Sequence, residues 1–294
     1  MSLDRIAVLI CLAGWLALVS TAEAAPLDKA LIVDGQNNHK WQETTPLLKR
    51  WLDESGLFTV DVATSPPKGG DMSKFQPDFA AYNVIVSNYN GEEWSDATKT
   101  GLVKFIRAGG GLVIVHAADN AFPKWKEWNE MIGLGGWGGR NETSGPYLRY
   151  RDDKLVRDTS AGSGGHHGKQ HPFQIVVRDA NHPITAGLPK AWMHAQDELY
   201  DRLRGPAENI GVLATAYSDT ATGGSGEHEP SLFTVTFGQG RIFHTTQGHG
   251  VEAMHCVGFI TTLVRGTEWA AAGKVTKTDV PADFPTPDKV SSRP

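Results

Sequence analysis

Short apolar segments alternate with helical patterns through the first 115 residues, and this alternation constrains the fold more than any other feature of the sequence. Residues 44–55 predict a helix with Pro46 in its first turn, and Ser95 predicts the N-cap of a second helix. The segments that we expect to be strands are 30–34, 58–63, 83–87 and 111–115. Strands and helices at this spacing form βαβ units. We therefore predict a flavodoxin-like α/β fold, with a mostly parallel sheet and helices on both faces.

The second half of the chain continues the strand pattern with fewer helices. Residues 237–240, Phe-Gly-Gln-Gly, predict a hairpin between the last two strands. The elements that we expect are strands at 173–177, 210–214, 232–236 and 241–244, and a helix over about 253–264. One α/β domain would then span residues 25–272, with an irregular Gly-rich insertion at 133–168 and an extended Pro-rich tail at 273–294.

The first 24 residues have the pattern of a secretory signal peptide. Arg5 precedes an apolar run, and Ala22-Glu23-Ala24 supplies the small residues of a cleavage site. The run is short for a transmembrane helix, and an uncleaved anchor is the alternative. Cleavage would leave 294 − 24 = 270 residues in the periplasm or outside the cell, without membrane contact. Cys256 would then be the only cysteine, which excludes an internal disulfide.

Composition and motifs exclude several classes of function. The net charge of −5 gives no basic surface for nucleic acid. No glycine-rich dinucleotide or Walker motif is present, so we expect no nucleotide cofactor. The turn after the fourth expected strand, where flavodoxin-like enzymes carry a Cys or Ser nucleophile, holds His116 followed by two alanines. With no GxSxG motif elsewhere, nucleophilic hydrolysis is disfavoured.

Candidate site residues follow several of the expected strands. They are Asn38, His39 and Trp41 after the first strand, His116 and Asp119 after the fourth, Glu198 and Tyr200 in a loop-like segment, and His249 after the hairpin. Ligands of open α/β sheets bind beyond the carboxyl ends of the strands, so these side chains can converge. Each histidine taken alone is more often structural. Three imidazoles and a carboxylate would suit zinc or another divalent ion, with His39, His116 and His249 as ligands. The same groups also suit acid–base chemistry without a metal.

Several motifs occur together in an order that resembles the ThuA-like (trehalose utilisation) proteins. They are Gln36-Asn37-Asn38-His39-Lys40-Trp41 with Thr44-Thr45-Pro46, the strand ending in His116, Asn181-His182-Pro183-Ile184, Asp197-Glu198-Leu199-Tyr200, and Gly240-Arg241 with Gly248-His249-Gly250. The resemblance covers roughly residues 30–266. It implies a fold similar to the class I glutamine amidotransferases without the nucleophilic cysteine. It also implies a role in sugar catabolism, beside dehydrogenases that oxidise glycosides to 3-keto sugars.

The chemistry of such a substrate suggests a role for each candidate residue. A ketone at C3 acidifies the proton at C2, and loss of that proton allows the glycosidic oxygen at C1 to leave. His116 or Glu198 would be the base, and His39 and His249 would stabilise charge directly or through a metal. Trp41 and Trp125 would stack on the sugar, while Asn38, Asp119 and Tyr200 would contact its polar groups.

The sequence leaves two other functions open. One is a carbohydrate-binding protein without activity, because tryptophan-rich loops and the missing nucleophile suit it. The other is metal-dependent hydrolysis of a substrate that is not a sugar. The expected partner is a small-molecule carbohydrate, and a homo-oligomer is compatible with the sequence.

Overall fold

The computed structural model describes residues 27–294, so the predicted signal peptide lies outside the described residues. One eleven-stranded sheet runs through the molecule, and its main path has the order β2-β1-β3-β4-β13-β12-β11-β8-β9. The parallel half consists of β1 (Asp28–Asp34), β2 (Phe58–Thr64), β3 (Val84–Ser87), β4 (Gly111–Val115) and β13 (Gly240–Thr245). These strands confirm the expected βαβ pattern.

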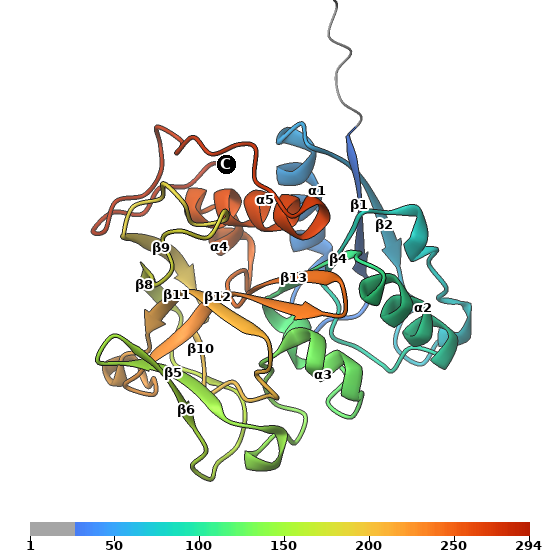
Figure 1. Ribbon diagram of the computed structural model, residues 1–294, viewed down its shortest axis with the longest axis horizontal. Coiled ribbons are helices and arrows are strands. Elements are labelled where there is room, and N and C mark those ends of the chain that lie inside the picture. Colours follow the sequence, from blue (N-terminus) through green and yellow to red (C-terminus); the bar gives the residue numbers. More distant parts are fainter. Residues whose placement is uncertain (1–26) are drawn as a thin grey trace, which may run out of the picture.

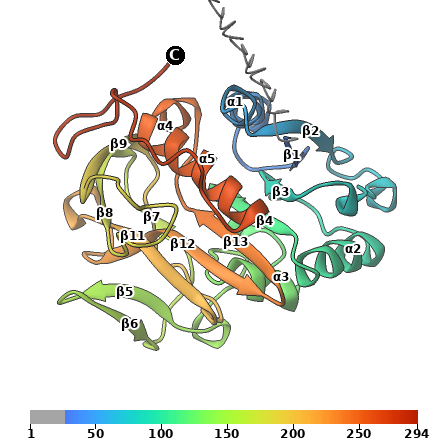
Figure 2. The same cartoon turned by 45° about the horizontal axis from the view of Figure 1, so that its top comes forward.

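The rest of the sheet is antiparallel, so the whole sheet is mixed. It consists of β12 (His228–Phe237), β11 (Ile210–Tyr217), β8 (His171–Val177) and β9 (Ala191–Asp197), with β5 (Tyr147–Arg151) and β6 (Lys154–Asp158) attached to β12. The expected hairpin joins β12 to β13. A separate small sheet pairs β7 (His166–His167) with β10 (Tyr200–Asp201). Figure 2 shows β5 and β6 next to β11 and β12.

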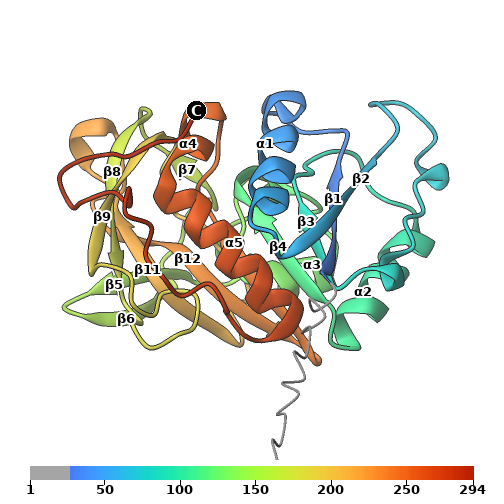
Figure 3. The same cartoon turned by 90° about the horizontal axis from the view of Figure 1, so that it is seen from above.

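Helices cover both faces of the parallel half, as expected (Figures 1 and 3). On one face lie α1 (Trp41–Glu54), α4 (Val251–His255) and α5 (Val257–Ala272), and on the other lie α2 (Asp96–Arg107) and α3 (Lys126–Ile132). Strand side chains alternate between these layers. Val113 and Val115 of β4 pack into the core below α1 and α5, whereas Leu112 and Ile114 pack toward α2 and α3.

Two helix boundaries differ from the expectation. Helix α1 begins at Trp41 rather than Thr44, so Pro46 lies beyond its first turn. The predicted last helix is two helices, because Cys256 has an extended backbone conformation (φ −60°, ψ 126°) that separates α4 from α5. Periodicity of apolar residues continues across such a break, which explains why the sequence pattern predicted a single element.

The segment 133–168 is less irregular than expected, because it contains the hairpin of β5 and β6. Its strands are rich in charged residues and lack the usual alternation of apolar side chains. Pairing replaces that alternation: Arg149 contacts Asp158 at 2.8 Å, and Arg151 contacts Glu227 at 2.6 Å. A pattern search for apolar residues therefore does not find this hairpin.

The C-terminal segment 273–294 lies against the domain. The ring of Phe284 packs edge-on against Trp192 with centroids 5.4 Å apart. Backbone amides also fix the segment, since Met193 donates to the carbonyl of Thr286 and Val257 to that of Ser291. Among the helices of residues 27–294, none has the length and apolar character needed to span a membrane.

Candidate active site

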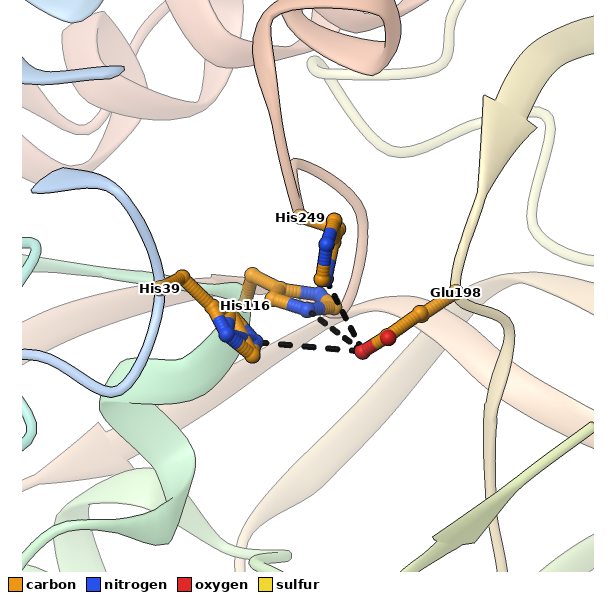
Figure 4. A group of neighbouring side chains, drawn as sticks. All are labelled: His39, His116, Glu198 and His249. Atoms are coloured by element: carbon orange, nitrogen blue, oxygen red, sulfur yellow. Dashed lines mark ion pairs between the residues drawn. The ribbon is translucent and has the colours of Figure 1, made fainter. Parts of the chain in front are cut away.

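Four side chains from distant parts of the chain meet beyond the carboxyl ends of the strands (Figure 4). His39 follows β1, His116 follows β4, His249 follows β13, and Glu198 follows β9. One nitrogen or oxygen atom from each residue lies within 4.8 Å of the corresponding atoms of the other three. The expected convergence of these residues is therefore confirmed, because parallel strands end at one edge of the sheet.

The carboxylate of Glu198 is the common neighbour of the three imidazoles. Its Oε2 lies 2.9 Å from Nδ1 of His249, 3.7 Å from Nε2 of His116 and 3.8 Å from Nε2 of His39. The His39 and His249 ring centroids are 4.3 Å apart, and those of His39 and His116 are 4.9 Å apart. None of the three imidazole rings stacks face to face on another. Each ring places one nitrogen within 4.8 Å of the ligand atoms of the other residues.

His116 is the most constrained member of the group. Its φ of +46° is rare for a residue with a side chain, and such strain persists only where the surroundings fix it. The ring is buried, and its Nδ1 donates a hydrogen bond to the carbonyl of Thr246 at 2.6 Å. Nε2 therefore carries a lone pair, and within residues 27–294 it has no hydrogen-bond partner. A backbone carbonyl on the far nitrogen is the arrangement that orients a metal-binding histidine.

Asp197 joins two of the contributing segments. Its buried carboxylate accepts hydrogen bonds from the backbone amides of Glu198, Gly248 and His249, at 2.8 to 3.0 Å. It also contacts Nε2 of His194 at 2.9 Å. Because one carboxylate holds both loops, the distance between Glu198 and His249 is fixed by the fold.

Electrostatics set the protonation of the cluster. Burial raises the pKa of Glu198, but contacts with His116 and His249 outweigh burial and hold its pKa far below the usual range. Burial and the two neighbouring imidazoles lower the pKa of His39 to about 4. The contact with Glu198 raises the pKa of His249. At neutral pH the cluster therefore offers an ionised carboxylate and a neutral His39, which are the forms that bind metals.

The donor set fits a divalent metal ion. Three imidazole nitrogens and one carboxylate oxygen suit zinc and similar ions, whose ligand bonds measure about 2.0–2.2 Å. Tetrahedral bonds of that length separate neighbouring ligand atoms by about 3.4 Å. The distances of 3.7 and 3.8 Å from Glu198 to His116 and His39 would contract slightly, and the 2.9 Å contact with His249 would lengthen. Other ligand atoms, which lie up to 4.8 Å apart, would move closer together. The unpartnered Nε2 of His116 supports the same interpretation, so the cluster could hold a metal.

A cavity of about 600 Å³ opens onto the cluster, with His116 buried behind it. Its lining is polar and contains one indole. The lining residues are Asn38, His39, Asn90, Asn120, Trp137, Gly138, His167, Glu198, Tyr200 and His249. None of these residues is a lysine or an arginine. The cavity thus offers amides and an aromatic ring to a ligand without presenting a fixed cation to an anionic group.

Tyr200 and Asn38 lie where the sequence predicted them, in the wall of this cavity. The Tyr200 hydroxyl lies 3.2 Å from Nε2 of His39, and the Tyr200 ring stacks on His116 at 4.0 Å. Burial, followed by the charges of Asp119 and Glu198, raises the pKa of Tyr200 well above its ordinary value. Trp41 lines a neighbouring cavity instead.

Two predicted contacts with the substrate are wrong. Asp119 is fully buried and faces His244, with 3.3 Å between its Oδ2 and Nε2 of that ring. It belongs to the core because the chain turns inward after His116. Trp125 stacks on Trp128 at 5.8 Å and borders a separate cavity between α2 and α3. A tryptophan near a strand end was mistaken for a lining residue because the sequence does not show which way the turn runs.

Trp137 and His167 also line the cavity, although neither is among the candidate site residues predicted from the sequence. Both lie in the segment 133–168, and the Trp137 ring meets that of Tyr200 edge-on at 4.8 Å. His167 directs Nε2 to within 3.8 Å of Oε1 of Glu198, while its Nδ1 donates to the carbonyl of Gly168 at 2.8 Å. The available signal was the neighbouring glycines, because Trp137 lies between Gly136 and Gly138 and His167 precedes Gly168. Loops of this kind often carry binding residues.

Comparisons with known proteins place the chain in a family. A family model described as ThuA: Trehalose utilisation matches residues 29–270. A solved structure of a protein described as ThuA-like, from Parabacteroides merdae ATCC 43184, is 52% identical with a TM-score of 0.89, covering 91% of this chain and 98% of its own. Another from Bacteroides uniformis ATCC 8492 is 18% identical with a TM-score of 0.61, covering 89% and 98%, and shows the fold alone. No match was found among curated proteins. This chain therefore belongs to the ThuA family.

Proposed function

We propose that this protein is a carbohydrate-processing enzyme that cleaves or rearranges a 3-keto glycoside at the His39–His116–Glu198–His249 cluster, with a divalent metal bound there. The observation that carries the proposal is the convergence of three imidazole nitrogens on one oxygen of Glu198. The matching family model is described as trehalose utilisation, which supports a sugar as the substrate.

The cavity chemistry also favours a neutral sugar. Asn38, Asn90 and Asn120 offer amide donors and acceptors that match hydroxyl groups, and Trp137 offers a ring face for the C–H groups of a pyranose. Because the lining contains no lysine or arginine, a phosphorylated sugar has no fixed cation to pair with. An unphosphorylated glycoside is therefore the proposed substrate.

The reaction begins with proton transfer from C2 of the sugar. The C–H electrons form an enolate with the C3 ketone, and the enolate then reforms the ketone as the C1–O bond breaks and C1=C2 forms. The departing oxygen takes a proton and leaves as an alcohol. A divalent metal at the cluster would supply positive charge that polarises the ketone oxygen.

His167 is the proposed proton acceptor. His116 cannot bind a metal through Nε2 and take a proton with the same atom, and its Nδ1 is held by Thr246. In His167, Nδ1 donates to Gly168, which leaves a lone pair on Nε2 inside the cavity. Oε1 of Glu198 lies 3.8 Å from that atom, where its negative charge would stabilise the imidazolium that forms when Nε2 takes the proton. His116 and Glu198, the bases expected from the sequence, would both be ligands of the metal, so this proposal gives the role of base to His167 instead.

Tyr200 completes the proposed constellation as a hydrogen-bond donor. The raised pKa keeps its hydroxyl protonated at neutral pH. The hydroxyl lies at the cavity wall, 3.2 Å from Nε2 of His39, and within reach of a ligand atom bound at the cluster. A protonated hydroxyl in that place stabilises negative charge that develops on the C3 oxygen.

Turnover of a defined substrate tests the proposal. Purified protein is incubated with methyl 3-ketoglucoside, before and after chelation of metal and with zinc or manganese added back. We expect release of methanol from the metal-loaded protein and loss of release in His116→Ala and His249→Ala. Binding of the sugar without any turnover under all metal conditions would contradict the proposal and favour a non-catalytic binding protein.

The proposal also covers the cellular location of the protein and its finer fold class. We infer that residues 1–24 direct the chain to the periplasm or out of the cell, and that the fold is of the class I glutamine amidotransferase type, with His116 in place of the nucleophile. Support comes from the signal-like sequence and from the strained φ of His116 after β4. N-terminal sequencing of the exported protein should begin at Ala25, and an intact Met1 would argue against cleavage.

A further inference from the structure

A second cavity of about 630 Å³ adjoins the one at the cluster. The two cavities share Asn38 and Asn90 in their linings, and the side chain of Asn90 donates to that of Asn38 at 2.6 Å. This amide pair therefore stands between the cavities. A ligand that crosses it would occupy both cavities and would still present one end to the cluster.

The second cavity also has one indole in its lining, but unlike the first it includes a lysine, Lys68. Trp41 is half-buried, and its backbone amide donates to the carbonyl of His39 at 2.9 Å, which fixes the turn between the two residues. Gln36, Asn37 and Gln42 line the same cavity, together with Lys68 and Glu92. One aromatic face among several amides is a surface that suits the apolar face and the hydroxyl groups of a pyranose.

The walls of the second cavity are fixed before any ligand binds. The Gln36 side chain donates to the carbonyl of Pro66 at 2.8 Å and accepts from the amide of Glu92 at 2.9 Å. Glu92 in turn accepts from the amide of Gly69 at 2.8 Å. Because these groups are ordered by one another, a ligand would bind without a large cost in conformational entropy.

We propose that the cavity at Trp41 is a second sugar subsite, which holds the ring on the other side of the bond that is cleaved. The substrate is then a glycoside of at least two rings, and its second ring stacks on Trp41. This inference rests on the proposed function for the identity of the reacting ring, but it concerns a separate set of residues.

The experiment compares two substrates in three proteins. The substrates are methyl 3-ketoglucoside, which has one ring, and a 3-keto glucose disaccharide, which has two. The proteins are wild type, Trp41→Ala, and Trp137→Ala as the matched control, because Trp137 lines the first cavity. We expect Trp41→Ala to lower kcat/KM for the disaccharide about tenfold more than for the methyl glycoside, the size of one lost stacking contact. Trp137→Ala should affect both substrates to a similar extent.

Binding measured by titration calorimetry tests the subsite at Trp41 independently of the proposed function. Wild type should bind the unoxidised disaccharide more tightly than methyl glucoside, and Trp41→Ala should remove that difference even if neither keto substrate is turned over. Turnover of both keto substrates with equal losses in Trp41→Ala and Trp137→Ala would overturn the subsite and leave the proposed function standing. Equal affinity of wild type for one and two rings would also overturn it.

Discussion

His116 shows how one residue combines strain, burial and an available lone pair. His116, directly after β4, has a φ of +46°. The hydrogen bond from its Nδ1 to the carbonyl of Thr246 fixes the tautomer in which Nε2 carries no proton. A buried nitrogen without a partner costs free energy unless a ligand satisfies it. The strain and the unpartnered atom together mark this residue as part of a binding centre rather than of the core.

Replacement of His116 by Ala should weaken metal binding. The change removes one of four ligand atoms. We expect the affinity for zinc to fall by at least about 100-fold, which exceeds the loss typical when only a residue that orients a ligand is changed. Competition with a chromophoric chelator measures the affinity. His171→Ala is the control, because its Nδ1 contacts the carbonyl of Lys169 and the residue lies outside the lining of the cluster cavity. Equal affinity in the two variants would refute the assignment.

Replacement of His167 by Gln should separate chemistry from metal binding. We expect kcat for methyl 3-ketoglucoside to fall about 10²–10⁴-fold, as for the loss of a proton-transfer residue. The affinity for zinc should fall much less than in His116→Ala, because His167 lies outside the four ligands. A variant that keeps full turnover would show that another group accepts the proton.

Among the strands, β12 carries an acidic side chain into the core. Glu229 is buried, accepts a hydrogen bond from Ser225 at 2.7 Å and lies 3.8 Å from Nε of Arg149. Burial outweighs these contacts and raises the pKa of Glu229 to about 7. The hairpin of β5 and β6 places Arg149 beside Glu229, so the guanidinium of the hairpin faces the buried carboxyl group of β12.

The stability of the fold should therefore depend on the protonation of Glu229. Its folded-state pKa of about 7 exceeds the ordinary value of 4.5, so the folded chain holds a proton that the unfolded chain releases between these values. The stabilisation is complete below pH 4.5 and is lost as the pH rises through 7, an effect on the order of 3 kcal/mol. Urea unfolding of wild type and Glu229→Gln at pH 5 and 8 measures it. The variant should gain stability relative to wild type at pH 8, and parallel pH profiles would contradict the assignment.

At the scale of the whole molecule, the C-terminal segment connects the two halves of the sheet. Phe284 packs on Trp192 of β9, while the backbone near Ser291 pairs with the start of α5. Arg265 of α5 donates to the carbonyl of Thr278 at 2.6 Å. The segment thus holds α5 against the antiparallel half, next to the loops that carry Glu198 and His249.

Replacement of Phe284 by Ala should lower the stability of the entire domain. The residue is half-buried, so we expect a loss of about 2 kcal/mol in the free energy of unfolding, less than for a fully buried phenylalanine. Phe237→Ala serves as a comparison, because Phe237 is also half-buried but lies at the C-terminal end of β12, where it packs beside Arg107 and not against the C-terminal segment. Thermal unfolding followed by far-UV circular dichroism measures both. A single unchanged transition in Phe284→Ala would show that the segment contributes no stability.

The sequence predicted the parallel half well because buried strands there are continuous apolar runs separated by amphipathic helices. The same placement at strand ends predicted that His39, His116, Glu198 and His249 would meet. It failed where polar pairing replaces apolar periodicity, as in the hairpin that contains Arg149. It also failed for Asp119 and Trp125, because the direction of a turn depends on tertiary packing rather than on local composition.

The measurement that tests the account most directly is the anomalous diffraction of crystals soaked in zinc, collected on both sides of the zinc absorption edge. The account predicts one strong peak among Nε2 of His39, Nε2 of His116, Nδ1 of His249 and Oε2 of Glu198, with each atom at about 2.0–2.2 Å. Zinc bound only elsewhere, with these four atoms still linked to one another or to water, would contradict the proposed metal centre.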